Sequence, residues 1–400
     1  MIGPDAVTEA GPAFPLLALL QRRIRLDGPL TVAEFMMAAL SHPRHGYYMT
    51  ADRFGAGGDF VTAPEISQVF GELIGLWCAQ CWDQLGRPDP VVLVELGPGR
   101  GTLMADALRA VSGVLPAFIA ACRLALVETS PVLRRRQEGA LAGFAPVWHD
   151  RLTEVACGPL LLVANEFFDA LPIRQFQRTP EGWAERLVDL EPETGERETL
   201  GRGTGALRFV LDRPGRPSTL ILPPRLRAAG PPEVPAGTVV DVAAAAQGIA
   251  LELGRRLARD GGAALVVDYG HSEAVPTDTL QAVRHHAPVP VLACPGEADL
   301  TSHVDFGALA AAATDGGAVA WGPVTQGAFL DSLGIATRAA ALRRTASPRQ
   351  ARDLDAAVTR LTADDSMGRL FKVLALTGPN QPAPAGFESF TPPFTDRPLP

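Results

Sequence analysis

The stretch that decides the fold of this chain is Val91-Val92-Leu93-Val94-Glu95-Leu96-Gly97-Pro98-Gly99-Arg100-Gly101-Thr102. Its apolar first half contains Glu95 near the end, a glycine-rich turn follows, and residues 103–110 are mostly good helix formers. This order predicts a buried parallel strand, a tight turn and a helix. A glycine turn in that position lets a nucleotide-like ligand approach the backbone closely.

The spacing of the glycines indicates the kind of ligand. A dinucleotide-binding turn has the form Gly-x-Gly-x-x-Gly, and Thr102 occupies the place of its third glycine. Here Gly97, Gly99 and Gly101 alternate instead. This form, preceded by Glu95, resembles the first motif of class I S-adenosylmethionine (SAM) methyltransferases. We expect Glu95 to position the charged methionyl end of SAM, through its amino group or through water. The alternative is an ordinary strand-turn-helix with a structural glycine turn.

A second acidic residue ends the next predicted strand. Residues 123–128 are apolar up to Glu128, and residues 129–131 offer a helix start. A carboxylate in this place suits a ribose diol, because it accepts hydrogen bonds from both hydroxyls. A solvated strand-end glutamate is the alternative, but the two acidic strand ends together favour a cofactor site.

Composition limits the classes of function. The 400 residues carry 36 Lys and Arg against 44 Asp and Glu, and this net charge of −8 argues against a general nucleic-acid-binding protein. We find no apolar run long enough to span a membrane and no basic N-terminal region typical of a signal peptide. The seven histidines show no metal-ligand spacing, so we expect no metal site.

The five cysteines are odd in number and scattered, which is typical of a reducing compartment. We therefore expect a cytoplasmic location. Cys78 and Cys81 form a single C-x-x-C pair within an apolar helical pattern. Buried thiols are the expectation there, rather than redox or zinc chemistry.

Alternating strand and helix signals predict an α/β fold: a Rossmann-like class I SAM methyltransferase sheet with an N-terminal helical cap and an antiparallel β insertion. Residues 1–90 form the cap with a Gly-rich loop, and residues 91–172 the first half of the SAM-binding core. Residues 173–240 form the insertion, a substrate platform or lid, because their predicted strands are too polar for a buried parallel sheet. Residues 241–400 form the second half of the core with the C-terminal helices.

The individual elements follow from hydrophobic periodicity. Helices are predicted for residues 16–26, 31–40, 64–84, 243–260, 304–313, 327–345 and 348–363, and further strands for 146–149, 160–166, 263–271, 318–324 and 371–377. Thr31 and Glu34 form a predicted capping box. The Gly-rich residues 55–62 predict a lid over the cofactor, with Thr62 among the cofactor contacts. A rigid structural loop is the alternative.

Several strand ends should meet in one place. In an open α/β sheet the ligand crevice lies at the carboxyl ends of the strands, so Glu95, Glu128 and Asn165-Glu166 should converge on one cleft. His149 ends the short predicted strand, and we expect it near the adenine of the cofactor together with Asp150.

Longer segments resemble one family. These are residues 46–48, 58–67, 70–72, 95–101, 165–172, 268–270, 295–306 and 322–327. Over residues 16–378 the chain resembles the MidA-like SAM-dependent methyltransferases, which include a mitochondrial protein arginine methyltransferase that serves complex I assembly. The segments Asn-Glu-Phe-Phe-Asp-Ala-Leu-Pro and Gly-Asp-Phe-x-Thr are highly specific. The chain departs from the family pattern at Asp241, where a Glu is expected, which shortens the reach of that acid.

The resemblance implies SAM as cofactor, with S-adenosyl-homocysteine as its product, and a protein substrate. It further implies symmetric dimethylation of an arginine on a subunit of respiratory complex I, with relatives in the mitochondrial matrix. The resemblance is compatible with a homodimer and does not define the oligomeric state. Two alternatives remain for the function: methylation of a small molecule, and a catalytically idle SAM-binding assembly factor.

The chemistry of arginine methylation indicates the catalytic residues. A guanidinium is a poor nucleophile because its lone pair is delocalised, and a carboxylate that pairs with it localises charge away from the attacking nitrogen. Glu166 and Asp169 are the candidates for this role, and Asn165 could orient the substrate by hydrogen bonds. Asn165 is also a predicted cofactor contact. His303 and Asp305 form a second candidate pair that removes the proton. The alternative for that pair is a helix cap with a structural histidine.

Overall fold

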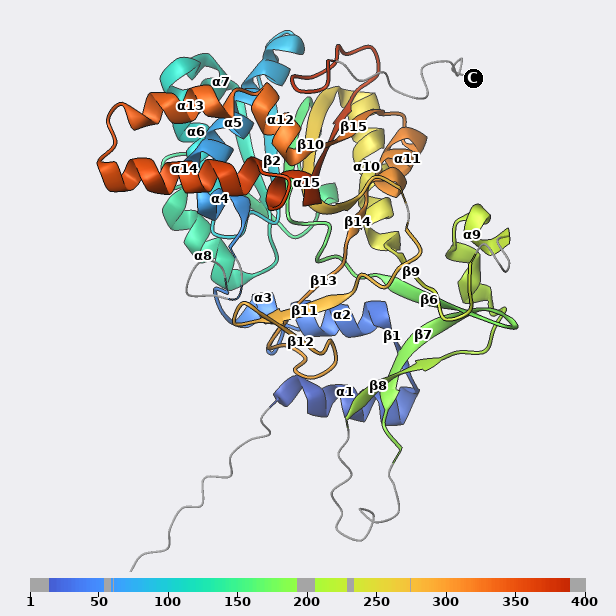
Figure 1. Cartoon of the computed structure of the whole chain (residues 1–400). Coiled ribbons are helices and arrows are strands. Elements are labelled where there is room, and N and C mark those ends of the chain that lie inside the picture. Colours follow the sequence, from blue (N-terminus) through green and yellow to red (C-terminus); the bar gives the residue numbers. More distant parts are fainter. Residues whose placement is uncertain are drawn as a thin grey trace, which may run out of the picture.

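The computed structural model describes residues 14–53, 59, 61–192, 206–228, 234–273 and 275–388. Within these residues a central eight-stranded sheet has the order β15-β16-β10-β5-β2-β3-β4, with β14 beside β10 (Figure 1). Its strands are β2 (Val91–Leu96), β3 (Cys122–Val127), β4 (Val147–His149), β5 (Leu160–Asn165), β10 (Gly262–His271), β14 (Val304–Asp305), β15 (Val319–Thr325) and β16 (Phe371–Thr377). The α/β class and the long predicted core strands are confirmed.

The direction of the strands locates the ligand crevice. Strands β4, β3, β2, β5 and β10 pair in parallel, whereas β16 runs antiparallel to both β10 and β15. Strands β3 and β4 follow β2 in the sequence and lie on one side of it, whereas β5, the next strand, lies on the other side of β2. The strand order therefore reverses at β2 and β5, and the crevice of such a sheet lies at the carboxyl ends of those two strands.

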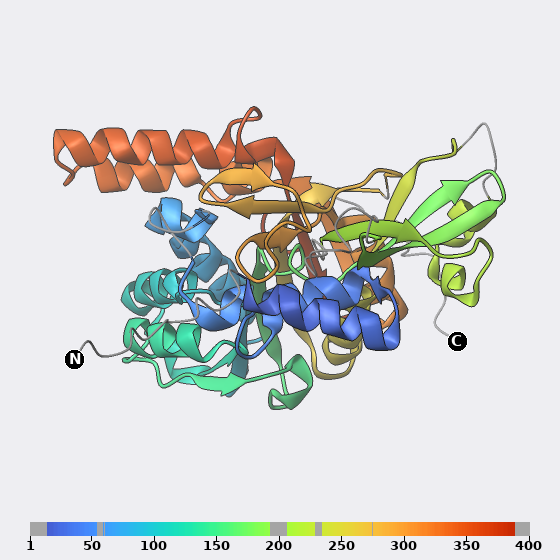
Figure 2. The same cartoon turned by 90° about the horizontal axis from the view of Figure 1, so that it is seen from below.

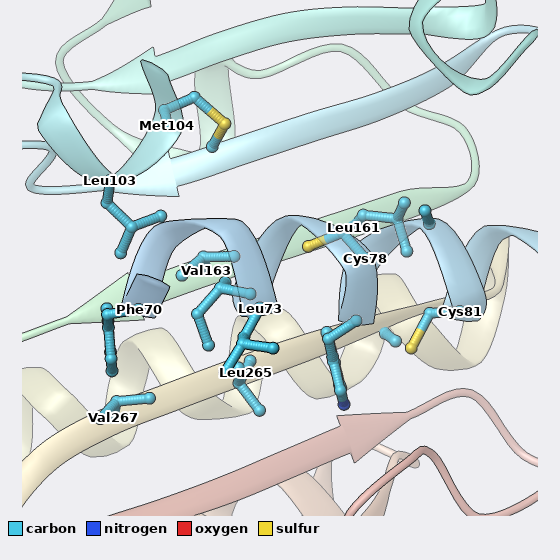
Figure 3. Close-up of a cluster of buried hydrophobic side chains, with 14 of the residues drawn as sticks. Phe70, Leu73, Cys78, Cys81, Leu103, Met104, Leu161, Val163, Leu265 and Val267 are labelled. Atoms are coloured by element: carbon cyan, nitrogen blue, oxygen red, sulfur yellow. The ribbon is translucent and has the colours of Figure 1, made fainter. Parts of the chain in front are cut away.

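Both faces of the sheet are covered, as the apolar strands require. Every residue of β2 and β5 is buried. Helices α5 (Gln68–Gln84) and α6 (Thr102–Val114) pack on one face, and α10 (Ala244–Asp260) and α11 (Phe306–Asp315) pack on the other. Figure 3 shows Leu73 of α5 against Val163 and Leu265 of the sheet. Cys78 and Cys81 lie in the same cluster as free, buried thiols, which confirms that expectation.

The N-terminal cap and the insertion share a second sheet. The cap contains α1 (Pro15–Asp27), β1 (Leu30–Thr31), α2 (Val32–Ser41) and α3 (Tyr47–Thr50). The insertion contains β6 (Arg174–Thr179), β7 (Gly182–Leu190), β8 (Leu207–Leu211) and β9 (Val239–Val242). Strand β1 pairs with β7, and all pairings in this five-stranded sheet are antiparallel. The capping box of Thr31 and Glu34 forms as predicted.

A third sheet, of three strands, was not predicted. It consists of β11 (Gln281–Arg284), β12 (Ala287–Val289) and β13 (Asp299–Thr301), in the order β12-β11-β13. Figures 1 and 2 show this sheet and the cap helices α1 and α2 together beyond one edge of the central sheet. The cap packs there through a separate apolar cluster that includes Phe35 of α2 and Leu300 of β13.

Three predicted helices differ in extent. The helix expected at 64–84 is divided at Ser67, whose extended backbone separates α4 (Ala63–Ile66) from α5 and whose hydroxyl caps α5. The helix expected at 327–345 is divided at Leu333 and Gly334, and Gly334 has φ 82°. The helix expected at 304–313 begins only at Phe306, because residues 304–305 form β14. The remaining elements are α7 (Pro116–Ala121), α8 (Pro131–Ala140), α9 (Pro224–Ala228), α12 (Gln326–Ser332), α13 (Ile335–Arg343), α14 (Pro348–Thr362) and α15 (Met367–Leu370).

Candidate active site

A cavity of about 880 Å³ lies at the carboxyl ends of the central strands. Its size is at the upper end of the range for small-molecule sites, roughly 300–1,000 Å³. Residues that follow β2, β3 and β5 line it, and so do parts of α3, β11 and β13. Among its lining residues are Tyr48, Thr62, Glu95, Gly97, Gly99, Glu128, Asp150, Asn165, Glu166, Asp169, Tyr269, Asp299 and His303.

The glycine turn after β2 forms one end of this cavity. Gly97, Gly99 and Gly101 have φ values of 61°, 54° and 82°, a region that favours glycine. A Cβ on Gly97 would lie 2.8 Å from Cδ2 of Phe167. Gly97 and Gly99 line the cavity, whereas Gly101 caps α6, and a Cβ there would lie 3.4 Å from Cα of Gln137. Gly101 is therefore a packing position, and the other two glycines are the ones that a ligand would approach.

Two buried glutamates face the same end. Glu95 is 3% exposed, and its Oε2 has no hydrogen-bond partner. Burial, with a smaller effect of Glu128, raises the pKa of Glu95 to about 8. Glu128 accepts from the Ser130 backbone N–H at 2.7 Å and from Nε2 of Gln137 at 3.2 Å, and burial raises its pKa as well.

These groups fit SAM. The unpartnered Glu95 oxygen is a natural acceptor for an ammonium group, because a buried polar atom without a partner is costly. Glu128, oriented by Ser130 and Gln137, presents a carboxylate of the kind that binds a ribose diol. The backbone at Gly97 and Gly99 leaves the space for a ligand to lie between the two acids.

Glu166 lies at the end of β5 in an uncommon backbone conformation. Its φ is 50°, which is rare for a residue other than glycine and is often associated with functional sites. Its Oε1 accepts from the backbone N–H of Ala63 at 3.1 Å and from Nδ2 of Asn165 at 3.2 Å. Desolvation, followed by the nearby Asp169 carboxylate, raises the pKa of Glu166 to about 8. The carboxyl is therefore held in a defined orientation on the cavity wall.

The turn that carries Glu166 and Asp169 is held by a residue without a predicted role. Asp268 is fully buried within β10, three residues before the strand ends, and its Oδ2 accepts from the backbone N–H groups of Phe167, Phe168 and Asp169 at 3.0–3.2 Å. The register places Val267 opposite Asn165, so Asp268 lies directly beside the start of this turn. The available signal was that it is an acid directly after the apolar run of a predicted strand, residues 263–271.

Two further carboxyl groups, those of Asp169 and Asp299, line the same cavity as Glu166, and we call these three side chains the acidic wall. Asp169 is 5% exposed with an unpartnered Oδ1, and burial raises its pKa to about 6. Asp299 of β13 accepts a hydrogen bond from the Tyr48 hydroxyl at 2.7 Å, and burial followed by Asp169 raises its pKa to about 7. Asp299 and Tyr48 were not predicted, and only the fold brings these two segments together.

The remaining predicted site residues have different positions. His303 lines the cavity, and burial lowers its pKa. Asp305 caps α11 by accepting from Ala308 N–H at 2.9 Å and is not among the lining residues, which agrees with the helix-cap alternative. His149 is also outside the lining, although its neighbour Asp150 belongs to it. Thr62 lines the cavity, but most of the proposed lid, residues 55–58 and 60, lies outside the described residues.

The described part of the chain contains no group of three or more His, Cys, Asp or Glu side chains arranged to hold a metal ion. Within the same residues, no helix is long and apolar enough to cross a membrane.

A Rossmann-like sheet with these acids and glycines at its switch point defines a SAM-binding methyltransferase. A family model described as putative S-adenosyl-L-methionine-dependent methyltransferase matches residues 73–324, and the chain belongs to this family. It is 39% identical to the mitochondrial protein arginine methyltransferase NDUFAF7 of Danio rerio, over 90% of this chain and 86% of that protein. It is 36% identical to the Homo sapiens protein of the same name, over 91% and 84%.

A solved structure adds the cofactor. The chain is similar to a Burkholderia thailandensis protein crystallised with S-adenosyl-homocysteine, with a TM-score of 0.76 and 29% identity. The similarity covers 90% of this chain and 91% of that one. The predicted family, fold, enzyme class and cofactor are thereby confirmed.

Proposed function

We propose that this protein is a protein arginine N-methyltransferase. The observation that carries this proposal is the group of three carboxyls, Glu166, Asp169 and Asp299, on the wall of one cavity. A guanidinium is a planar cation with five N–H donors, which matches a wall of carboxylate oxygens better than a neutral nucleophile would. The names of the similar proteins support the same activity.

The residues of the wall have distinct tasks in this proposal. SAM, when bound, supplies an electrophilic methyl group. Glu166, held by Ala63 and Asn165, pairs with the guanidinium and localises its charge away from the attacking nitrogen. Methylation of that nitrogen releases one proton, and Asp169 or Glu166, each with a pKa raised toward neutrality, accepts it. His303 remains a second candidate for the proton, without Asp305 as its partner.

The substrate, the product and the setting are finer proposals. From the family resemblance we propose symmetric dimethylation of an arginine on a subunit of respiratory complex I. All five cysteines are free, which is consistent with a reducing compartment such as the bacterial cytoplasm.

A transfer experiment separates the classes of function. A cell lysate that lacks this protein is incubated with the purified chain and SAM carrying a labelled methyl group. Label in protein, recovered as dimethylarginine after hydrolysis, is the expected result. Label in a small molecule would contradict the proposal and favour the alternative methyltransferase, and no transfer would favour a SAM-binding assembly factor.

The first prediction concerns Glu166. Glu166→Gln keeps the shape of the side chain and removes its charge, so we expect methyl transfer to fall about 100-fold or more. Affinity for SAM should stay within a few-fold of wild type, because Glu166 is not one of the predicted cofactor ligands. Single-turnover rates at saturating SAM measure the effect. Glu138→Gln, at an exposed position of α8, is the control. A Glu166→Gln rate within a few-fold of wild type would remove this carboxylate from the mechanism.

A further inference from the structure

Two neighbouring tyrosines make the same contact in different surroundings. The hydroxyl of Tyr47 donates to Oδ2 of Asp59 at 2.7 Å, and the hydroxyl of Tyr48 donates to Oδ1 of Asp299 at 2.7 Å. Both aspartates are buried, with 2% and 6% exposure. Only the second pair, Tyr48 and Asp299, lines the cavity. The first pair therefore has a structural role, and the second is available to a ligand.

The Tyr48–Asp299 pair is held on both sides. Asp299 begins β13 and is paired with Val283 of β11, which fixes its backbone. The backbone carbonyl of Tyr48 accepts from the Ser130 hydroxyl at 2.6 Å, which ties α3 to the start of α8. The carboxyl of Asp299 is therefore preorganised on the wall, and its orientation does not depend on a ligand.

A second observation is that two buried acceptor atoms on this cavity wall have no donor. Oδ1 of Asp169 and Oδ1 of Asn165 have no hydrogen-bond partner, although these side chains are only 5% and 7% exposed. Both residues line the same cavity as Asp299. Because unpartnered buried acceptors are rare in folded proteins, they indicate a ligand that brings several N–H groups.

We propose that Asp299, positioned by Tyr48, is a second carboxylate that binds the substrate guanidinium beside Glu166 and sets a preference for arginine over lysine. This inference rests on the proposed function and deepens it. A guanidinium presents N–H groups along more than one edge of a rigid plane, so it can contact two carboxylates at once. An ammonium group is a compact point charge on a flexible stem and matches such a divided set of acceptors less well.

Binding experiments on the full chain test this assignment directly. The protein is saturated with S-adenosyl-homocysteine and titrated by calorimetry with Nα-acetyl-arginine amide, or with Nα-acetyl-lysine amide for comparison. Wild type should bind the arginine probe more tightly than the lysine probe. Asp299→Asn should weaken binding of the arginine probe about 10- to 100-fold, which is the scale of one charge-assisted hydrogen bond. The ratio of the affinities for the arginine and lysine probes should therefore become smaller. Affinity for S-adenosyl-homocysteine should remain unchanged, which also verifies folding.

The two tyrosines provide a matched pair of variants. Tyr48→Phe removes the donor to Asp299, so the carboxyl should ionise at higher pH and arginine binding should weaken several-fold near neutral pH. That loss should largely disappear at about pH 9, where the carboxyl is ionised again. Besides burial, the carboxyls of Asp169 and, to a smaller extent, Asp59 raise the pKa of Asp299. Tyr47→Phe removes a hydrogen bond of equal length to Asp59, so it acts on Asp299 only indirectly and should change arginine binding and its pH profile much less than Tyr48→Phe. A merely structural role of Tyr48 would not produce a loss that depends on pH.

The outcomes separate this inference from the proposed function. If wild type binds the arginine probe and Asp299→Asn binds it equally well, the role of Asp299 is wrong while arginine methylation stands. Identical pH profiles for the Tyr47→Phe and Tyr48→Phe proteins would also contradict it, and this test remains if Asp299→Asn does not fold. If wild type binds neither probe, the assignment of Asp299 is wrong, and the label-transfer experiment decides separately whether the protein methylates arginine.

Discussion

Glu166, directly after strand β5, has a strained backbone conformation and a side chain that is fixed in the cavity. Glu166 keeps a φ of 50° because the turn that follows it is fixed by hydrogen bonds: three of its backbone N–H groups donate to one oxygen of Asp268. A strained conformation of this kind costs about 1–3 kcal/mol and persists only where the surroundings determine it. The carboxyl of Asp268 is thus a positioning group for the side chains at 166 and 169.

Gly99 is the residue at which cofactor binding and backbone strain can be separated. With φ 54° on the cavity wall, Gly99→Val is strained and fills space that the cofactor needs. We expect affinity for S-adenosyl-homocysteine to fall at least about 100-fold, or about 2.7 kcal/mol, in a protein that remains folded. Calorimetry and thermal unfolding measure the two effects.

The control for this variant is Gly86→Val. Gly86 also has a positive φ, 81°, but a Cβ there would meet nothing within 4 Å. It should lose stability and keep its cofactor affinity. Unchanged affinity in a folded Gly99→Val protein would show that the glycine turn does not contact the cofactor.

At the scale of elements, helix α8 connects the two halves of the predicted cofactor site. Gln137 is fully buried on this helix, and its Nε2 donates to the Gly99 carbonyl at 2.8 Å and to Glu128 at 3.2 Å. Its Oε1 accepts from the indole N–H of Trp148 at 2.8 Å. One amide therefore links the glycine turn, the acid after β3 and strand β4.

Gln137→Leu should disturb all three contacts while keeping most of the volume. It leaves three polar groups without this partner, so we expect a loss of about 2–4 kcal/mol of stability in urea unfolding. Affinity for S-adenosyl-homocysteine should fall about tenfold, because Glu128 loses one of the donors that orient it. Gln80→Leu, at an exposed position of α5, is the control and should change neither quantity. A stable Gln137→Leu protein with wild-type affinity would contradict this role.

At the scale of the whole molecule, the fold gathers acids that are far apart in the sequence, from Glu95 to Asp299, around one cavity. Desolvation raises the pKa of Glu95 and Glu166 to about 8 and that of Asp299 to about 7, from ordinary values of 4.5 and 3.8. The folded protein without ligand therefore binds protons at neutral pH that the unfolded chain has released. Their contribution to stability is complete below the unfolded pKa and is lost as pH rises through the folded pKa.

We accordingly predict that the unliganded protein becomes less stable from about pH 7 to about pH 8.5, by at most about 1.4 kcal/mol per pH unit for each such group. Two histidines, His271 and His303, do not oppose this trend in that window, because burial lowers the pKa of both. Urea unfolding at a series of pH values measures the slope.

Glu95→Gln isolates one contribution to that slope. It should be more stable than wild type at about pH 8.5, with a smaller difference at about pH 6, and it should bind S-adenosyl-homocysteine more weakly. Stability that is flat or rising between pH 7 and pH 8.5 in wild type would show that these carboxyls are already ionised in the folded protein.

The amino-acid sequence by itself was sufficient for the long strands of the central sheet and for the convergence of three acidic strand ends, although the predicted cofactor contacts Gly101 and His149 do not line the cavity. Strands such as residues 91–96 are continuous apolar runs, and their periodicity is a local property of the chain. The rule that parallel strands end at one edge then placed Glu95, Glu128 and Glu166 on one cavity, as the structure has them. Two predicted helices were wrong in extent, because their apolar pattern continues across a break in the helix. The breaks lie at Ser67 and Gly334.

Only the tertiary structure decided which groups complete the acidic wall. Tyr48 and Asp299 are 251 residues apart, and Ala63 and Glu166 are 103 apart, so no local pattern links either pair. Asp299 lies on β13, a strand of three residues that was not predicted from the sequence. Its burial, its partner and its unusual pKa all arise from the packing of the cap against that sheet, which forms only when the whole chain has folded.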